Sequence, residues 1–242
     1  MIPKKFVFLV DMHVPFNIYL DPVYEFIQDF KPDITILGGD IGEFGPVNHW
    51  LADQSKYLDT GIIIEHYAQL KLDVFNPIKK ATPKSEKIFL EGNHENWIHL
   101  ATAQDPNLRG YIELAKNIPS EYKIIPLNRP YRMNENLAVI HGAYTGMYHA
   151  RQTVEAYMTS ILYGHNHTFQ TFTKVSPIDN ERFYTAMSIG SLCELNPGFM
   201  KNRPNAWING LAYGYLGERN TFSVVSVVIV RNRFHAEGRY YK

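Results

Sequence analysis

The chain has 242 residues, and its 24 Lys and Arg balance 24 Asp and Glu, so the formal net charge is zero. This balance argues against a nucleic-acid coat protein or a membrane-surface binder, because both depend on a large excess of cations. Apolar residues make up 45% of the chain, a composition typical of folded globular proteins rather than disordered ones.

Two further features of composition bear on location. The lone Cys193 cannot form an intramolecular disulfide, which favours a reducing, cytoplasmic environment. No stretch approaches the roughly 18 apolar residues of a membrane-spanning helix, so we expect no membrane partner.

The first part of the chain predicts two strands joined by a helix. An apolar run at residues 6–10 is typical of a strand buried on both faces, and residues 34–37 repeat the pattern. Between them, apolar residues at helical spacing follow Asp21 and Pro22, which suit the start of a helix. This order predicts parallel strands with a right-handed crossover, whose following loops open at one edge of the sheet.

The middle of the chain continues the alternation of strands and helices. Three further strands are predicted, at residues 87–90, 137–140 and 160–163. Helices are predicted around the first of these, at residues 62–74, 96–103 and 107–117. All five strands end in polar loops, which we expect to meet at the same edge.

The last third changes character, because strands follow one another without helices. They are predicted at residues 169–175, 182–189, 222–230 and 233–240, with a tight turn at Arg231-Asn232. We therefore predict a single α/β domain over residues 1–242, a two-sheet sandwich flanked by helices, with mixed strands and an antiparallel C-terminal part. Residues 196–217 are predicted to be one long loop that could cover the active site.

The residues that close the five strands are of one chemical kind, oxygen and imidazole ligands of divalent metals. They are Asp11, His13, Asp40, Asn93, His94, His141, His165 and His167. One such ion takes about four protein ligands plus solvent, so this number of candidates implies a pair of ions about 3.5 to 4 Å apart. The sequence therefore predicts a dinuclear centre of Mn, Fe, Co, Ni or Zn.

The order of these motifs resembles a known family. Asp11-x-His13, Gly39-Asp40, Gly92-Asn93-His94-Glu95, His141-Gly142 and Gly164-His165-x-His167 resemble the five motifs of the calcineurin-like metallophosphoesterase superfamily. The resemblance covers residues 6 to about 168. Segments 190–197 and 203–207 additionally resemble phosphoesterases encoded by bacteriophages and prophages, which would place the protein in the host cytoplasm.

The resemblance implies roles for the motif residues. One metal would be held by Asp11, His13, Asp40 and His167, and the other by Asp40, Asn93, His141 and His165. Asp40 would bridge the two ions, with manganese the first choice of metal. A hydroxide held between the ions would attack phosphorus. His94 would protonate the leaving oxygen or stabilise its charge, and Glu43 is a candidate to orient His94.

The resemblance also shows a departure. Protein Ser/Thr phosphatases carry an Asp and then a phosphate-clamping Arg where this chain has Glu43 and Phe44. We therefore expect a dinuclear metal-dependent phosphoesterase acting on a phosphodiester of a nucleotide or of a DNA or RNA end. Two alternatives stay open: a phosphomonoesterase or pyrophosphohydrolase of a small metabolite, and a metal-stabilised scaffold without turnover.

Substrate contacts are predicted in two places. Trp207 in the long loop, close to Arg203, combines a ring face with a cation and could stack a base while holding a phosphate. Tyr144 could line the cleft from the loop that follows His141. Trp50 and Trp97 are interpreted as packing residues, and the sequence leaves the physiological metal and the oligomeric state open.

Overall fold

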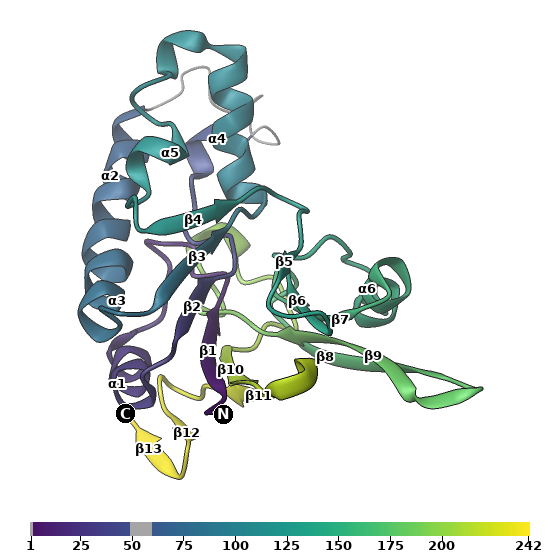
Figure 1. The fold of residues 1–242 in the computed structure, drawn as a ribbon. Coiled ribbons are helices and arrows are strands. Elements are labelled where there is room, and N and C mark those ends of the chain that lie inside the picture. Colours follow the sequence, from purple (N-terminus) through teal and green to yellow (C-terminus); the bar gives the residue numbers. More distant parts are fainter. Residues whose placement is uncertain (1, 49–59) are drawn as a thin grey trace.

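The computed structural model describes residues 2–48 and 60–242, which form two large β-sheets with helices on their outer faces (Figure 1). The larger sheet consists, in spatial order, of β11 (Phe222–Val228), β10 (Gly210–Leu216), β1 (Lys4–Leu9), β2 (Ile34–Leu37), β3 (Glu86–Leu90) and β4 (Tyr122–Ile125). Strands β1 to β4 are parallel, whereas β10 is antiparallel to both of its neighbours.

The smaller sheet consists, in spatial order, of β5 (Tyr131–Arg132), β6 (Leu137–Val139), β7 (Ser160–Tyr163), β9 (Asp179–Ile189) and β8 (Phe169–Ser176). Strands β6, β7 and β9 are parallel, and β8 pairs with β9 as an antiparallel hairpin that projects from the molecule in Figure 1. A separate small hairpin joins β12 (Phe234–Ala236) to β13 (Arg239–Tyr241).

Each sheet is covered by helices on its outer face, the one that points away from the other sheet (Figure 1). On the larger sheet lie α1 (Asp21–Phe30), α2 (Thr60–Leu70), α3 (Asn76–Ala81), α4 (Asn93–Gln104) and α5 (Leu114–Asn117), with a π-helical turn at Lys71–Phe75 between α2 and α3. On the smaller sheet, α6 (His149–Tyr157) packs against β7, β8 and β9. No helix within the described residues combines the length and apolar character that crossing a membrane requires.

The apolar run of β1 serves two cores at once. Val7 and Leu9 face the helices, where they pack in one buried cluster with Phe26 of α1. Phe6 and Phe8 face the other way, into a cluster that includes residues of β6 and β7. Because side chains alternate along a strand, a strand buried on both faces must be apolar at every position. The second cluster joins the two sheets, so the predicted two-sheet α/β sandwich is confirmed.

The five strands predicted to end in polar loops are present, but they belong to different sheets. Strands β1, β2 and β3 lie in the larger sheet, and β6 and β7 lie in the smaller one. The prediction of a single common edge was therefore wrong. Loops of the two sheets nevertheless meet, since the N–H of His165 after β7 donates to Asp11 after β1 and His141 after β6 contacts the carbonyl of Gly38 after β2.

Two other predictions need correction. Residues 210–216 of the predicted 196–217 loop form β10, which lies next to β1, so the irregular stretch ends at Asn209. The segment 233–240 is interrupted by a turn at Glu237 and Gly238, both at positive φ, which separates β12 from β13. The predicted antiparallel C-terminal part is confirmed, because β8 pairs with β9, β10 with β11 and β12 with β13 in antiparallel fashion.

Candidate metal centre

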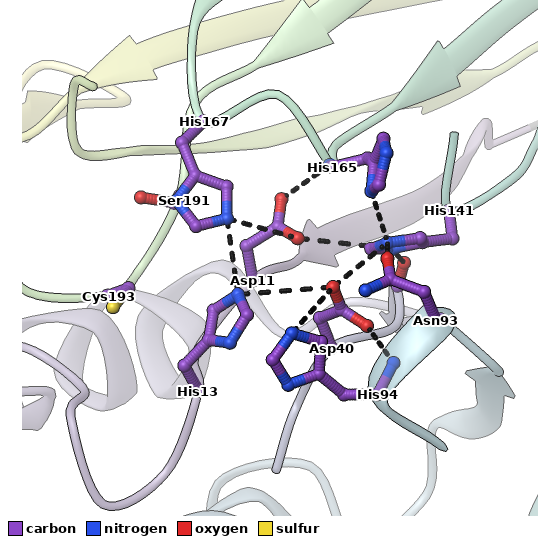
Figure 2. A network of polar contacts seen from close by, with 12 residues as sticks. Asp11, His13, Asp40, Asn93, His94, His141, His165, His167, Ser191 and Cys193 are labelled. Carbon is purple, nitrogen blue, oxygen red and sulfur yellow. Dashed lines mark hydrogen bonds and ion pairs between the residues drawn. The ribbon is translucent and has the colours of Figure 1, made fainter. Parts of the chain in front are cut away.

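The loop after β1 is tied to the loop after β2 by backbone hydrogen bonds. The N–H of Asp11 donates to Gly39 O at 3.1 Å, and that of His13 donates to Asp40 O at 3.0 Å. Parallel neighbours bring these loops to the same sheet edge, and the two bonds fix their relative position. The side chains of Asp11, His13 and Asp40 consequently face one point (Figure 2).

Five of the predicted ligands have a left-handed backbone. Their φ angles are 53° at Asp11, 49° at His13, 49° at Asp40, 70° at His165 and 56° at His167. Residues other than glycine rarely adopt this region, which costs on the order of 1–2 kcal/mol each. The surrounding hydrogen bonds must offset that cost, and clusters of such residues are typical of functional sites.

The first group of donor atoms comes from Asp11, His13 and His167, whose ligand atoms lie within 4.8 Å of one another. His13 Nε2 and His167 Nε2 are 3.2 Å apart, and His167 Nε2 lies 3.6 Å from Asp11 Oδ1. These are the three residues that the resemblance assigns to the first metal together with Asp40.

The second group comes from Asp40, His141 and His165, and Asn93 joins it. His141 Nε2 lies 3.2 Å from Asp40 Oδ2, 3.2 Å from Asn93 Oδ1 and 3.2 Å from His165 Nδ1. Four donor atoms from four different loops thus meet around one place, and they belong to the residues that the resemblance assigns to the second metal.

Asp40 lies between the two groups. Its Oδ2 atom is 3.2 Å from His141 Nε2 on one side and 4.0 Å from His13 Nε2 on the other. Its Oδ1 atom accepts the backbone N–H of His94 at 2.9 Å, which restrains the carboxylate and leaves Oδ2 toward the two groups. Burial would raise the pKa of Asp40, but the surrounding histidines, His141 foremost, hold it well below its usual range.

Two ring tautomers follow from the partners of the histidines. His141 Nδ1 lies 3.0 Å from the carbonyl of Gly38, which can only accept, so Nδ1 donates and Nε2 is left for the centre. His13 Nδ1 lies 2.8 Å from Glu43 Oε2, which orients its Nε2 inward in the same way. A carboxylate or carbonyl behind a ligating imidazole is the usual support of a metal-binding histidine.

The pKa values of His13 and His141 are shifted in opposite directions. Burial, with His94 and His167 adding to it, lowers the pKa of His13 well below its ordinary value, so the ring is neutral and able to ligate. Burial would also lower the pKa of His141, but the carboxylates of Asp40, Asp11 and Glu95 outweigh it and raise that pKa to about 10. In the absence of a metal, His141 Nε2 is therefore protonated as well as Nδ1, and a metal ion bound at Nε2 would displace that proton.

A buried atom without a partner supports the fit of this centre to a cation. Asp11 Oδ2 accepts the N–H of His165 at 2.7 Å, but Asp11 Oδ1 is fully buried and forms no hydrogen bond among the described residues. A buried carboxylate oxygen without a partner is costly, and a metal ion would satisfy it. The donor set of carboxylate oxygens, imidazole nitrogens and one amide oxygen suits borderline divalent ions.

His94 lies beside the centre with one nitrogen free to act there. Its Nδ1 atom donates to the carbonyl of Glu43 at 2.5 Å, and its Nε2 atom is 3.9 Å from Asp40 Oδ2. The ring packs on Trp97 with centroids 3.9 Å apart. Glu43 does orient His94, but mainly through its backbone, since its carboxylate lies closer to His13 (2.8 Å) than to His94 (3.5 Å).

Glu95 is a structural residue of the centre whose role sequence reasoning missed. Its buried carboxylate accepts the backbone N–H groups of Gly92 and Asp40 on Oε2 and of Ile41 on Oε1, at 2.8 to 2.9 Å. Burial, with the nearby charge of Asp40, raises the pKa of Glu95 to about 7. Glu95 thus joins the loops after β2 and β3; its place in the Gly-Asn-His-Glu motif was the available signal.

Two glycines are required by close approach. A Cβ at Gly92 would lie 2.2 Å from Asp40 Oδ1, and a Cβ at Gly164 would lie 2.4 Å from Asp11 Oδ2. Neither glycine has a positive φ, so glycine is needed at these positions because it makes room for a carboxylate and not because of the backbone conformation.

Replacing Gly92 by alanine is therefore expected to displace Asp40. Metal affinity, measured by titration of the metal-stripped protein in a calorimeter, should fall by about 10-fold or more, as for lost outer-shell support. Gly198→Ala is the matched control, because a Cβ there meets nothing within 4 Å. Equal affinities for the two variants would contradict this interpretation of Gly92.

The predicted substrate contacts have different outcomes. Trp207 lies next to the centre, its ring centroid 4.1 Å from that of His167. Arg203 is exposed, and Tyr144 meets the adjoining loop through its backbone oxygen, which accepts a hydrogen bond from Asn166 Nδ2 at 2.8 Å. The structure thus brings Trp207 to the centre and leaves the roles of Arg203 and Tyr144 as predictions. Trp50 lies outside the described residues.

No protein-family model and no curated protein matches this chain. Similar solved structures include Vacuolar Protein Sorting 29 from Cryptosporidium parvum, with 12% identity, 99% of this chain and 95% of that chain covered, and a TM-score of 0.48. Vps29 from Chaetomium thermophilum has 10% identity, coverages of 94% and 99%, and a TM-score of 0.45. A Streptococcus pneumoniae protein described as a predicted phosphoesterase has 12% identity, coverages of 99% and 97%, and a TM-score of 0.41. The site is therefore interpreted from its own geometry.

Proposed function

We propose that this chain is a dinuclear metal-dependent phosphoesterase whose preferred substrate is a phosphodiester of a nucleotide or of a nucleic-acid end. The observation that carries the proposal is the position of Asp40, whose carboxylate lies between two groups of metal-ligating atoms. Asp11, His13 and His167 would hold one ion with Asp40, and Asn93, His141 and His165 would hold the other.

Bound divalent ions would supply Lewis-acid polarisation of phosphoryl oxygens and a lowered pKa for coordinated water. The protein itself would hold these ligands in position and supply the proton that the leaving group needs. His94, with its Nδ1 proton engaged by Glu43, presents Nε2 toward the substrate side and would donate a proton from it to the leaving oxygen. Trp97 fixes the plane of that ring.

The preference for a diester follows from the shortage of positive charge. Phe44, at the position of the phosphate-clamping arginine in the protein phosphatases, is fully buried and has no charged group that could bind a phosphate. Among the described residues, the hydrogen bonds and ion pairs of the seven ligands involve no Lys or Arg. A monoester carries about 1.5 to 2 negative charges at neutral pH and a diester one, so the diester needs less neutralisation.

The test is hydrolysis of bis-p-nitrophenyl phosphate and p-nitrophenyl phosphate by metal-stripped protein reloaded with Mn, Ni, Co or Zn. We expect metal-dependent cleavage, at least about 10-fold faster in kcat/KM for the diester. Faster monoester cleavage would move the substrate to phosphorylated metabolites. No activity with two ions bound would favour the scaffold interpretation. Manganese as the physiological metal, the cytoplasmic location and the phage-like origin stay predictions.

A further inference from the structure

A cleft of about 680 Å³ lies beside the candidate metal centre and takes no part in the proposed chemistry. Three segments form its walls: the loop before α6, the start of β8, and the segment that contains Trp207. Asn166, which lines the cleft, stands between the ligands His165 and His167 in the chain. The volume is in the range of small-molecule sites, about 300 to 1,000 Å³.

The wall next to the metal centre is rigidly placed. The N–H of Ile208 donates to the carbonyl of His167 at 2.8 Å, so the Trp207 segment runs alongside a ligand loop. The N–H of Trp207 itself donates to Asn205 Oδ1 at 2.9 Å. The indole therefore stands between the cleft, which it lines, and the ring of His167, against which it packs.

Phe169 lines the cleft and packs closely against Gly210. A Cβ at Gly210 would lie 2.3 Å from the Phe169 ring, so the ring occupies space that any other side chain at position 210 would need. With Ile208 and Met147 it gives the cleft an apolar lining. Met147 is 80% exposed, which leaves a long, adaptable apolar side chain at the mouth.

The polar groups of the cleft are uncharged. Its lining contains no Asp, Glu, Lys or Arg. Its one titratable group is His149, whose ring nitrogens contact Tyr163 OH at 2.6 Å and Thr168 Oγ1 at 3.2 Å, and burial lowers its pKa. The lining thus suits neither a second phosphate, which needs cations, nor a metal, which needs carboxylates.

Two polar side chains in the lining have spare hydrogen-bonding capacity. Asn166 uses Nδ2 on Tyr144 O, and its Oδ1 has no partner among the described residues. The hydroxyl of Thr145 is likewise without a hydrogen-bond partner in the described part of the chain, and Thr145 is exposed. An uncharged ligand with flat apolar faces and a polar edge would match this combination.

We propose that this cleft binds the nucleobase of the substrate, with the base stacked on Trp207 and its edge toward Asn166 and Thr145. The inference rests on the proposed function, because it names the substrate class of the same site. Base–aromatic stacking is sequence-tolerant, and its loss weakens binding by about 5- to 150-fold per base. The cleft would select nucleotides over phosphate esters that lack a base.

The test is calorimetric binding of the four nucleoside 5′-monophosphates and of ribose 5-phosphate to the metal-loaded protein. We expect at least one nucleotide to bind about 10-fold or more tightly than ribose 5-phosphate. Trp207→Leu, which removes the ring face, and Thr145→Trp, which puts a large ring at another lining position and so fills part of the cleft, should each abolish this preference. Phe183→Leu is the control, since Phe183 is a half-exposed ring on β9, outside the cleft lining.

Binding of ribose 5-phosphate, which has no base, distinguishes an effect on the cleft from an effect on the metal centre. If Trp207→Leu weakens binding of ribose 5-phosphate as much as binding of the nucleotides, the Trp207 ring only supports His167, and the proposal is overturned. Equal affinity of all five ligands for the unmodified protein would overturn it as well. If the protein prefers nucleotides but hydrolyses no ester, the cleft assignment stands and the proposed function is rejected. If it hydrolyses esters but shows no preference for nucleotides, the proposed function stands and the cleft assignment is rejected.

Discussion

Replacing Asp40 by alanine is expected to abolish metal-dependent phosphoester hydrolysis. Asp40 Oδ2 lies near the inward-facing nitrogens of both groups, 3.2 Å from His141 Nε2 and 4.0 Å from His13 Nε2. Loss of an outer-shell partner of a metal ligand costs about 10- to 100-fold, so loss of a ligand shared by two ions should cost more than about 100-fold. The assay is kcat/KM for bis-p-nitrophenyl phosphate, with bound metal measured alongside.

Alanine at this position also changes the backbone, because φ is +49° there. Asp40→Asn is therefore the second variant, since asparagine tolerates the left-handed region and keeps an oxygen to accept the N–H of His94. Both variants should remain folded by circular dichroism and bind less metal than the unmodified protein. Hydrolysis within 10-fold of normal in Asp40→Asn, with two ions bound, would show that the carboxylate charge is not needed.

The second large effect is expected at His94 and depends on the leaving group. General acid catalysis contributes about 10²- to 10⁴-fold when the leaving group needs a proton. His94→Ala should therefore lower kcat by about that factor for a dialkyl or nucleotide ester. For a p-nitrophenyl ester, whose leaving anion needs no proton, the loss should be much smaller. The measurement is the slope of log kcat against leaving-group pKa, which should be steeper in the variant.

His99→Ala is the matched control on the same helix. The His99 side chain is half-exposed and bonds Glu91 rather than the centre, with Nε2 and Oε1 2.8 Å apart. The slope of log kcat against leaving-group pKa for His99→Ala should equal that of the unmodified protein. An unchanged slope in His94→Ala would reject the proton-donor assignment, and an equal loss for all esters would assign His94 to charge stabilisation instead.

Much of the fold and of the candidate site could be predicted because the signals are local. The run at residues 6–10 had to be a doubly buried strand, and β1 confirms it. Strands β2 and β7 begin and end where the apolar pattern does. The seven candidate ligand positions could be found because each has a side chain of a type that can bind a metal and lies within a few residues of the end of such a strand.

The features that could not be predicted depend on tertiary contacts, which no local sequence pattern reveals. Strand β10 was read as loop because Gly210 and Gly214 interrupt its apolar pattern, yet those glycines make room for the rings of Phe169 and Phe6. Strand β4 was missed because Lys123 breaks a run of only four residues at the sheet edge. The carboxylate of Glu43 contacts His13, and its backbone carbonyl bonds His94. This arrangement depends on the conformation of the loop, which the spacing of the residues along the chain does not reveal.

The five left-handed ligands have a consequence for the stability of the metal-free fold. At such positions glycine or asparagine would relieve the backbone strain, so each Asp or His retained there lowers the stability of the chain. In this chain Asp11, His13, Asp40, His165 and His167 all carry that cost, so the metal-free fold is less stable than the backbone alone would allow. A metal ion bound by these residues would offset the cost, because a ligand that binds only the folded state stabilises it.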